Sequence, residues 1–220
     1  MIVIIGDLID SRKLQNRTFV QQQLQNCLNE LNNKYHDDIS AKFTVTLGDE
    51  FQGLLFSGFN FLRMIDEIQI RMSPVKIRFG IGIGRLHTPI NYEVCIGMDG
   101  PAFWKAREAL NFVHENNDYS RINIHLCLEK YDPSVNLINE IIKLTALQMS
   151  GWRKTQKELY QMVLEEGIMS PEKINHQRMA KKIGISRSSL SRRFESSGIK
   201  RYMSAQMEAE SAIQTINICL

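Results

Sequence analysis

The chain has 220 residues, of which 43% are hydrophobic and 23% are charged, a balance typical of a globular protein in water. No apolar run is long enough to cross a bilayer, and the short apolar start MIVIIGD has no basic segment before it, so we expect neither a membrane span nor a signal peptide. Four cysteines and five histidines are dispersed without metal-ligand spacing. We therefore expect reduced thiols, no zinc site and a cytoplasmic protein.

The formal net charge of +3 conceals a strong asymmetry along the chain. Residues 1–150 carry 15 Lys and Arg against 17 Asp and Glu, whereas residues 151–206 carry 12 against 5. A basic segment of this kind is typical of a nucleic-acid contact surface.

Hydrophobic periodicity predicts alternating strands and helices over the first 132 residues. Apolar runs rich in β-branched residues predict strands at 1–6, 41–47, 50–56, 75–84 and 121–128. A further β segment is expected before Gly97, and the glycines of 75–84 predict close backbone approach or a bulge. Helical spacing of apolar residues predicts helices at 14–35, 60–72 and 102–113. This order, with a Gly48-Asp49 hairpin turn at its centre, predicts an α+β sheet with helices on one face, related to the ferredoxin-like plan.

After residue 132 the pattern becomes entirely helical. Helices are expected at 135–149, 155–166, 177–198 (as a pair) and 200–216. We therefore predict two domains, 1–132 and 133–220. The broad apolar side of the last helix has two interpretations: it closes the helical domain, or it pairs with a second copy. A homodimer is slightly favoured, because paired half-sites multiply affinity for DNA.

The segment QRMAKKIGISRSSLSRRFESSG (177–198) has the pattern of a helix-turn-helix. Ala180 supplies the small residue at the helix crossing, Gly184 the turn, and Leu190 the apolar anchor of the second helix. Ser186 is placed to cap that second helix. The alternatives are an ordinary helical hairpin with a basic surface and a protein-contact surface.

The DNA interpretation assigns roles to nine polar side chains of this region. Four are expected to face the major groove, where arginine can bond guanine edges: Arg187, Ser188, Ser191 and Arg192. Five cations are expected to neutralise phosphates: Lys181, Lys182, Arg193, Lys200 and Arg201.

Two aspartates occupy positions where the predicted topology brings them together. Asp7 follows the first strand and Asp49 lies at the hairpin tip. Neighbouring carboxylates repel unless a cation lies between them, and Mg²⁺ is commonly bound by one or two carboxylates with phosphate oxygens. The plainer interpretations are a strand-end polar residue for Asp7 and a turn residue for Asp49.

Four fragments resemble class III nucleotide cyclases and their diguanylate-cyclase relatives, in the same order along the chain. These are IIGDLIDS, TLGDEFQG, IRFGIGIG and GPAFWKAR, and LGDEF resembles the GGDEF signature with Leu47 in place of the first glycine. The resemblance implies that Asp7 and Asp49 hold Mg²⁺ or Mn²⁺ and that Arg107 contacts a nucleotide phosphate.

The same resemblance also shows departures. Val45 stands where a class III enzyme has a purine-selecting lysine, and Phe103 where it has an asparagine. Groups that orient the base and stabilise the transition state are thus missing, and ordinary cyclase turnover is not expected.

Over nearly its full length, from GDLIDSR and GDEFQG to the C-terminal helices, the chain resembles the SatD family. That resemblance implies a cytoplasmic bacterial regulator and transfers no activity. We expect a DNA-binding transcriptional regulator with a degenerate cyclase-like domain that senses a nucleotide or metal. The alternative is a metal-dependent nucleotidyl-transfer or phosphohydrolase enzyme that uses Asp7 and Asp49, with the basic domain holding a nucleic-acid substrate.

Overall fold

A computed structural model describes residues 1–56, 60–116 and 122–218. Its five strands form one mixed sheet in the order β2-β3-β1-β4-β5. The central strand β1 (Ile2–Leu8) is antiparallel to both β3 (Glu50–Leu55) and β4 (Ile77–Ile83). β2 (Ile39–Val45) pairs antiparallel with β3, and β5 (Ile124–Leu128) pairs parallel with β4. The predicted strand Arg121–Leu128 begins outside the described residues.

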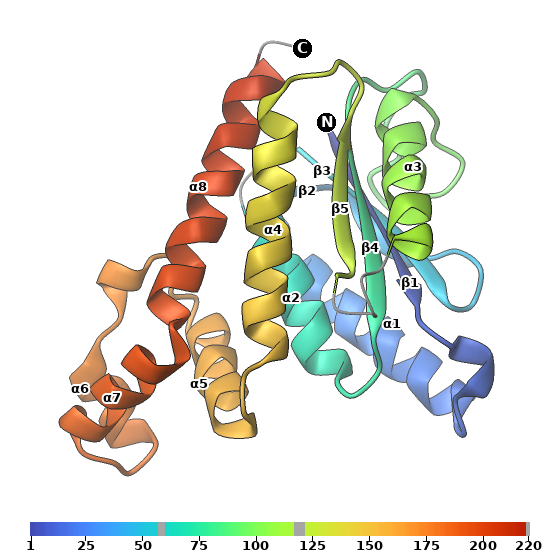
Figure 1. The fold of residues 1–220 in the computed structure, drawn as a ribbon. Coiled ribbons are helices and arrows are strands. Elements are labelled where there is room, and N and C mark those ends of the chain that lie inside the picture. The colour runs from blue at the N-terminus through green and yellow to red at the C-terminus, as the bar shows by residue number, and fades with distance from the viewer. Residues whose placement is uncertain (57–59, 117–121, 219–220) are drawn as a thin grey trace.

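The helices of the described chain lie between and after these strands (Figure 1). Their bounds are α1 (Arg17–Lys34), α2 (Phe61–Met72), α3 (Pro101–Glu115), α4 (Ser134–Ser150), α5 (Lys154–Glu165), α6 (His176–Lys182), α7 (Arg187–Ser197) and α8 (Ile199–Ile218). Two short 3-10 helices are η1 (Ser11–Lys13) and η2 (Pro171–Lys173). The predicted α+β class is confirmed. The β segment expected before Gly97 is wrong, because residues 85–100 form turns and extended loop.

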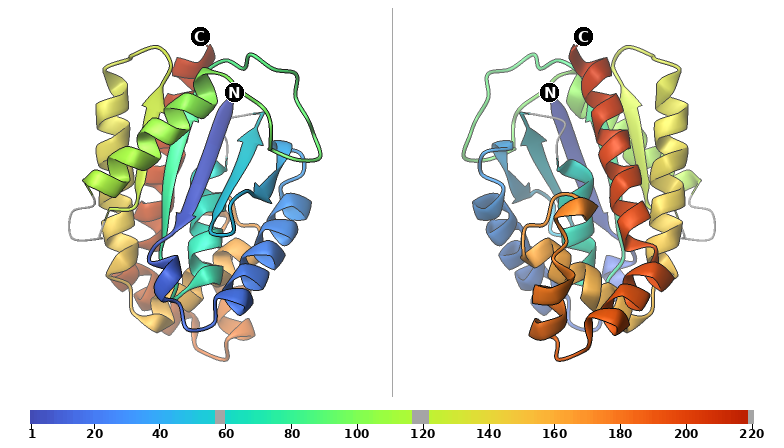
Figure 2. Two further views of the ribbon diagram at one scale, coloured as in Figure 1. Left: turned by 90° about the vertical axis from the view of Figure 1, so that its right-hand side faces the viewer. Right: turned by 90° about the vertical axis from the view of Figure 1, so that its left-hand side faces the viewer.

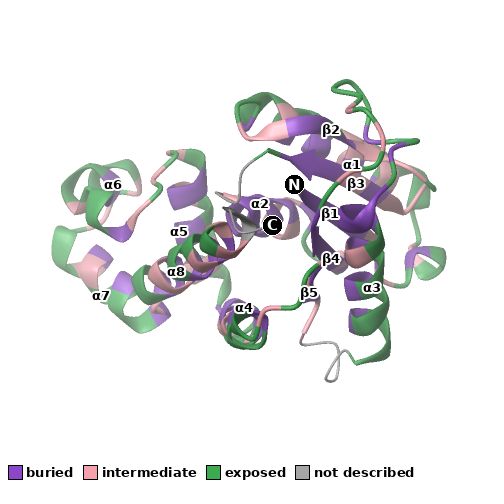
Figure 3. Cartoon of the chain, turned by 90° about the horizontal axis from the view of Figure 1, so that it is seen from above, coloured by how far each residue is buried: buried purple, intermediate pink, exposed green. Residues whose placement is uncertain are grey.

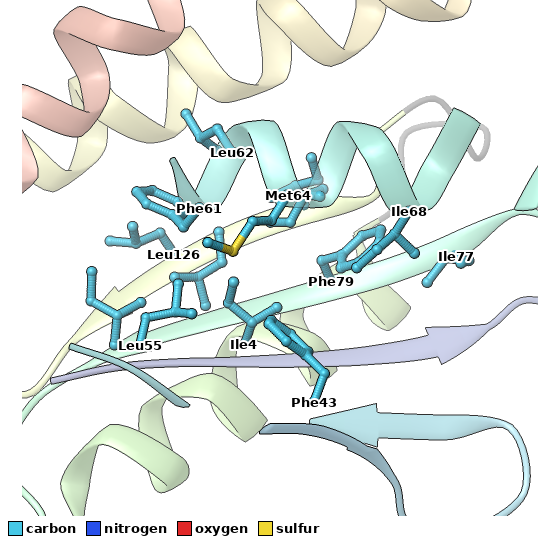
Figure 4. Close-up of a cluster of buried hydrophobic side chains, with 14 of the residues drawn as sticks. Ile4, Phe43, Leu55, Phe61, Leu62, Met64, Ile68, Ile77, Phe79 and Leu126 are labelled. Carbon is cyan, nitrogen blue, oxygen red and sulfur yellow. The ribbon is translucent and has the colours of Figure 1, made fainter. Parts of the chain in front are cut away.

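The sheet is covered on both faces, which corrects the expectation of helices on one face only. Successive side chains of a strand point to opposite faces. Ile2 and Ile4 belong to the core cluster that includes α1 and α2, and Figure 4 shows Ile4 on the side of the sheet that faces α2. Val3 and Ile5 pack with α3. Seen from above, α2 and α3 lie on opposite sides of the strands (Figure 3). The prediction of helices on one face failed because β1 is apolar on both faces. Such a strand does not indicate which face the helices cover.

The glycines of β4 allow α3 to lie directly against the sheet. A Cβ atom built on Gly82 would lie 2.1 Å from the carbonyl oxygen of Ala102 and 2.2 Å from the amide nitrogen of Ala106. Gly80 meets the backbone of the next turn of α3 in the same way. The predicted close backbone approach is therefore confirmed.

The helical C-terminal part shares its core with the sheet. Val135, Ile138 and Ile142 of α4 and Ala209 and Ile213 of α8 belong to the cluster formed by the strands, α1 and α2. A second cluster, which runs from Met149 to Met203, holds α5, α6, α7 and the start of α8 together. Helix α8 lies alongside α4 (Figure 2), and its buried residues belong to both clusters, so it closes the sheet core as well as the helical part. Pairing with a second copy stays a prediction.

Buried polar groups on α2 connect these two clusters. The Asp66 carboxylate accepts hydrogen bonds from the hydroxyls of Tyr160 and Tyr202, both at 2.7 Å, and from Gln206 at 2.9 Å. Burial raises the pKa of Asp66 to about 6. Glu210 of α8 accepts the backbone N–H of Leu62 at 2.8 Å, so it caps the start of α2. Partnering of this kind is what makes buried polar groups tolerable.

Glu210→Gln is expected to remove part of the pH dependence of stability. Burial raises the pKa of Glu210 to about 8, so between its ordinary value and pH 8 the folded protein holds a proton that the unfolded chain has released. Stability then falls as pH rises, by about 1.4 kcal/mol per pH unit. Between pH 6 and 8 the variant should gain roughly 2 kcal/mol relative to the wild type. Urea unfolding at both pH values measures this; parallel pH curves for the two proteins would contradict it.

Candidate functional sites

The acidic site lies at the end of β1, on the face of the sheet that α3 covers. Asp7 stands opposite Glu50 on β3 and opposite Arg78 on β4, and directly opposed residues share a face. Arg78 donates to the Asp7 carboxylate at 3.1 Å. From α3, Arg107 donates to both carboxylate oxygens of Glu50, with one bond of 2.7 Å. The pair is therefore bidentate, the stronger form of an arginine-carboxylate contact.

Asp49 reaches the same site from the hairpin turn. Its carbonyl oxygen accepts the backbone N–H of Leu8 at 3.0 Å, next to Asp7, and its carboxylate accepts a hydrogen bond from the Ser11 hydroxyl. Gly48 makes the turn with φ +78°, a conformation that glycine adopts without strain. The structure thus gathers Asp7, Asp49 and Arg107, which are far apart in sequence.

The electrostatics of the site reflect this crowding of carboxylates. Burial raises the pKa of Asp7, Arg78 opposes that rise, and the charges of Asp49 and Glu50 add to it. The hydrogen bond to Glu50 raises the pKa of Arg107, with a further contribution from Asp7. The ionised form of Asp7 is therefore stabilised when a positively charged group approaches.

The donors present fit a divalent cation only in part. Asp7 is paired with Arg78 and Asp49 with Ser11, and among the described residues no three His, Cys, Asp or Glu side chains form a group that would hold a metal. Two carboxylates are enough for Mg²⁺ only when waters or phosphate oxygens complete its octahedron. Any Mg²⁺ or Mn²⁺ here would accordingly be held by Asp7 and Asp49 together with a phosphate-bearing ligand.

Sequence reasoning assigned no role to three members of this site: Ser11, Glu50 and Arg78. Arg78 had a usable signal, because it is a charged residue between the buried Ile77 and Phe79 and alternation along a strand turns it to the opposite face from them. That signal places Arg78 beside Asp7 only if β1 and β4 are known to be neighbours. The pairing of Glu50 with Arg107 had no sequence signal, since it joins residues 57 positions apart.

The basic region lies at the other end of the molecule from α3 (Figures 1 and 2). Helices α6 and α7 pack through the buried side chains of Met179, Ala180 and Leu190. The turn between them contains Gly184 with φ +68°. The Ser186 hydroxyl accepts the backbone N–H of Ser189 at 3.1 Å, which confirms the predicted cap of the second helix.

Most of the nine side chains assigned to DNA are exposed on this pair and on the start of α8. These exposed residues are Lys181, Lys182, Arg187, Ser188, Arg192, Arg193, Lys200 and Arg201. Lys182 pairs with Glu166 at 3.1 Å and Ser188 bonds Ser186 at 3.0 Å. Ser191 is half-buried, and its hydroxyl lies 3.0 Å from Nδ1 of His176. Ser191 is therefore engaged within the protein, unlike the arginines beside it.

The fold and these two sites define an α+β protein in which a sheet with a carboxylate-arginine site is joined to a basic helical region. The sequence profile of the SatD family matches residues 1–213, and the chain belongs to this family. A comparison with curated proteins found no match. Among the described helices, none has the length and apolar character that crossing a membrane requires.

Proposed function

We propose that this SatD-family protein is a DNA-binding transcriptional regulator, in which α6 and α7 act as a helix-turn-helix. The observation that carries the proposal is the cationic surface of α7, where Arg187, Arg192 and Arg193 are exposed and the helix is fixed from below by Leu190 and Phe194. A rigid helix that presents arginines to solvent matches the geometry of major-groove recognition.

The sheet is proposed to be a degenerate relative of the nucleotide-cyclase domain. The strand order β2-β3-β1-β4, with β1 antiparallel to both neighbours, supports the ferredoxin-like plan. In this proposal residues 1–132 sense a nucleotide, with Mg²⁺ or Mn²⁺ held at Asp7 and Asp49 and the phosphates near Arg107. Because Arg107 is tied to Glu50 by two hydrogen bonds, a phosphate has to replace Glu50 there.

A single substitution tests the DNA assignment. Arg192→Ala is expected to weaken binding to a preferred duplex by about 1–3 kcal/mol and to relax sequence preference, because a bidentate contact to a base is lost. Fluorescence anisotropy with the protein's own upstream region and a random duplex measures both effects. Lys42→Ala, which removes the same charge from β2, is the control. Equal affinity of wild type and Arg192→Ala for both duplexes would remove this residue from the interface.

The alternative, a metal-dependent nucleotidyl-transfer or phosphohydrolase enzyme, rests on the gathering of Asp7, Asp49 and Arg107 at one site. It requires Mg²⁺- or Mn²⁺-dependent turnover of a nucleotide that disappears in Asp49→Asn. Nucleotide binding without turnover favours the sensing role instead.

A further inference from the structure

A pocket of about 670 Å³ opens on the basic helical region, between η2, α6, α7 and α8. Its cationic side chains come from three different elements: Lys173 from η2, Arg187 from α7 and Lys200 from α8. The one acidic side chain on its wall is Glu172. Three cations against one carboxylate give the pocket a net positive charge.

The protein offsets these three cations only in part, since Glu172, whose pKa is lowered by local hydrogen bonds and to a smaller extent by the charge of Lys200, is the one carboxylate that lines the pocket. In residues 1–56, 60–116 and 122–218, neither Lys173, Arg187 nor Lys200 forms an ion pair with a carboxylate. Other cations of the chain, such as Arg78 and Lys182, are paired. Three positive charges around one negative charge leave a net repulsion, so the arrangement is stabilised when an anion enters the pocket.

A buried aromatic ring packs against two of the residues that line the pocket, His176 and Lys200. The ring of Phe194, which is buried, lies 5.1 Å from the imidazole of His176 and 5.9 Å below Nζ of Lys200. The Ser191 hydroxyl holds His176 through Nδ1, and Nε2 of His176 has no hydrogen-bond partner in the described chain. Burial, and then the charges of Lys200 and Arg187, lower the pKa of His176. The imidazole of His176 is thus a neutral polar group on the side of the pocket, and its Nε2 atom has no hydrogen-bond partner in the described chain.

We propose that this pocket is a phosphate clamp that takes one phosphodiester of the DNA backbone, held by Lys173, Arg187 and Lys200. This inference rests on the proposed DNA binding and refines it, because it moves Arg187 from base recognition to the backbone. Arg187 and Ser191 line the pocket, whereas Ser188 and Arg192, each one position further along α7, remain outside it and exposed. A phosphate held on one side of α7 fixes the position of this helix along the DNA. The adjacent side of α7, with Ser188 and Arg192, is then free to contact the bases.

The clamp makes a prediction that differs from base recognition. Lys200→Ala and Lys173→Ala should each weaken binding to every duplex by the same factor, about threefold to tenfold, and lower the slope of log K against log salt by about one. Both lysines are exposed, so the variants are expected to fold. Lys42→Ala, with the same loss of charge on β2, should leave the slope unchanged. Anisotropy titrations at several salt concentrations give these values.

The outcomes separate the clamp from the proposed function. If wild type binds DNA and both lysine variants keep its salt slope, the clamp is overturned while the regulator proposal stands. If wild type binds no DNA, the protein is titrated with inorganic phosphate while the NMR signals of the His176 ring are recorded. This titration shows whether the pocket binds an anion. Saturable shifts that are lost in Arg187→Ala would identify a site for a free phosphorylated ligand. Unchanged resonances would remove the pocket as an anion site.

Discussion

Replacing Arg63 by methionine is expected to lower the free energy of unfolding by about 2–3 kcal/mol. Arg63 of α2 is buried, and its guanidinium donates to the carbonyl oxygens of Ile168 at 2.7 Å, Leu164 at 3.0 Å and Val163 at 3.2 Å. These carbonyls lie at the end of α5 and just beyond it, where the last carbonyl groups of a helix lack the regular i to i+4 partners and are bonded by the following turn and by side chains. Methionine keeps the packing volume but donates nothing, so each of the three carbonyl oxygens loses a charged donor. Val163 and Leu164 keep backbone N–H bonds from Ile168 and Gly167, and Leu164 also keeps the Lys34 ammonium, so the largest loss falls on the carbonyl of Ile168.

Urea unfolding, followed by circular dichroism, measures the effect. Arg193→Met, on the exposed side of α7, is the matched control and should change stability by less than about 0.5 kcal/mol. Amide exchange should also accelerate over α5 in the Arg63 variant, because that helix loses its cap. A loss of stability equal to that of the control would mean that water replaces the guanidinium at little cost.

Gly82→Ala is expected to destabilise the protein by about 3 kcal/mol, at the upper end of what overpacking costs. The new methyl group would lie 2.1 Å from the carbonyl oxygen of Ala102 and 2.2 Å from the amide nitrogen of Ala106. Both contacts are with the backbone of α3, which cannot turn aside as a side chain can. The whole helix has to move away from β4, and Arg107, which α3 carries to Glu50, moves with it.

The melting temperature should fall by roughly 10 °C for a chain of this size. Gly151→Ala is the control, because Gly151 has φ −78° and its added methyl group would meet nothing closer than 3.5 Å. That substitution should be neutral or stabilising by about 0.4–1 kcal/mol, since it reduces the freedom of the unfolded chain. Equal melting temperatures for Gly82→Ala and wild type would show that α3 shifts freely on the sheet.

The sequence by itself determined the succession of strands and helices. Apolar spacing located the strands and helices that the structure contains, and Ser186 and Gly184 marked the cap and turn of α6 and α7. These features are local, because periodicity and capping depend on residues within a few positions of one another. The positions of Asp7 near a strand end and of Asp49 at a turn also followed from the sequence, because the apolar pattern defines both places.

Only the tertiary structure decided what those local elements meet. The two-sided covering of the sheet is one such arrangement. The Glu50–Arg107 pair joins residues 57 positions apart, and the hydrogen bonds from Arg63 to the end of α5 join residues 100 to 105 positions apart. The pocket at Lys173, Arg187 and Lys200 likewise exists only when η2, α7 and α8 are packed. No short-range pattern encodes such contacts. The periodicity of an element shows which of its faces is apolar, but it does not show which other element will cover that face.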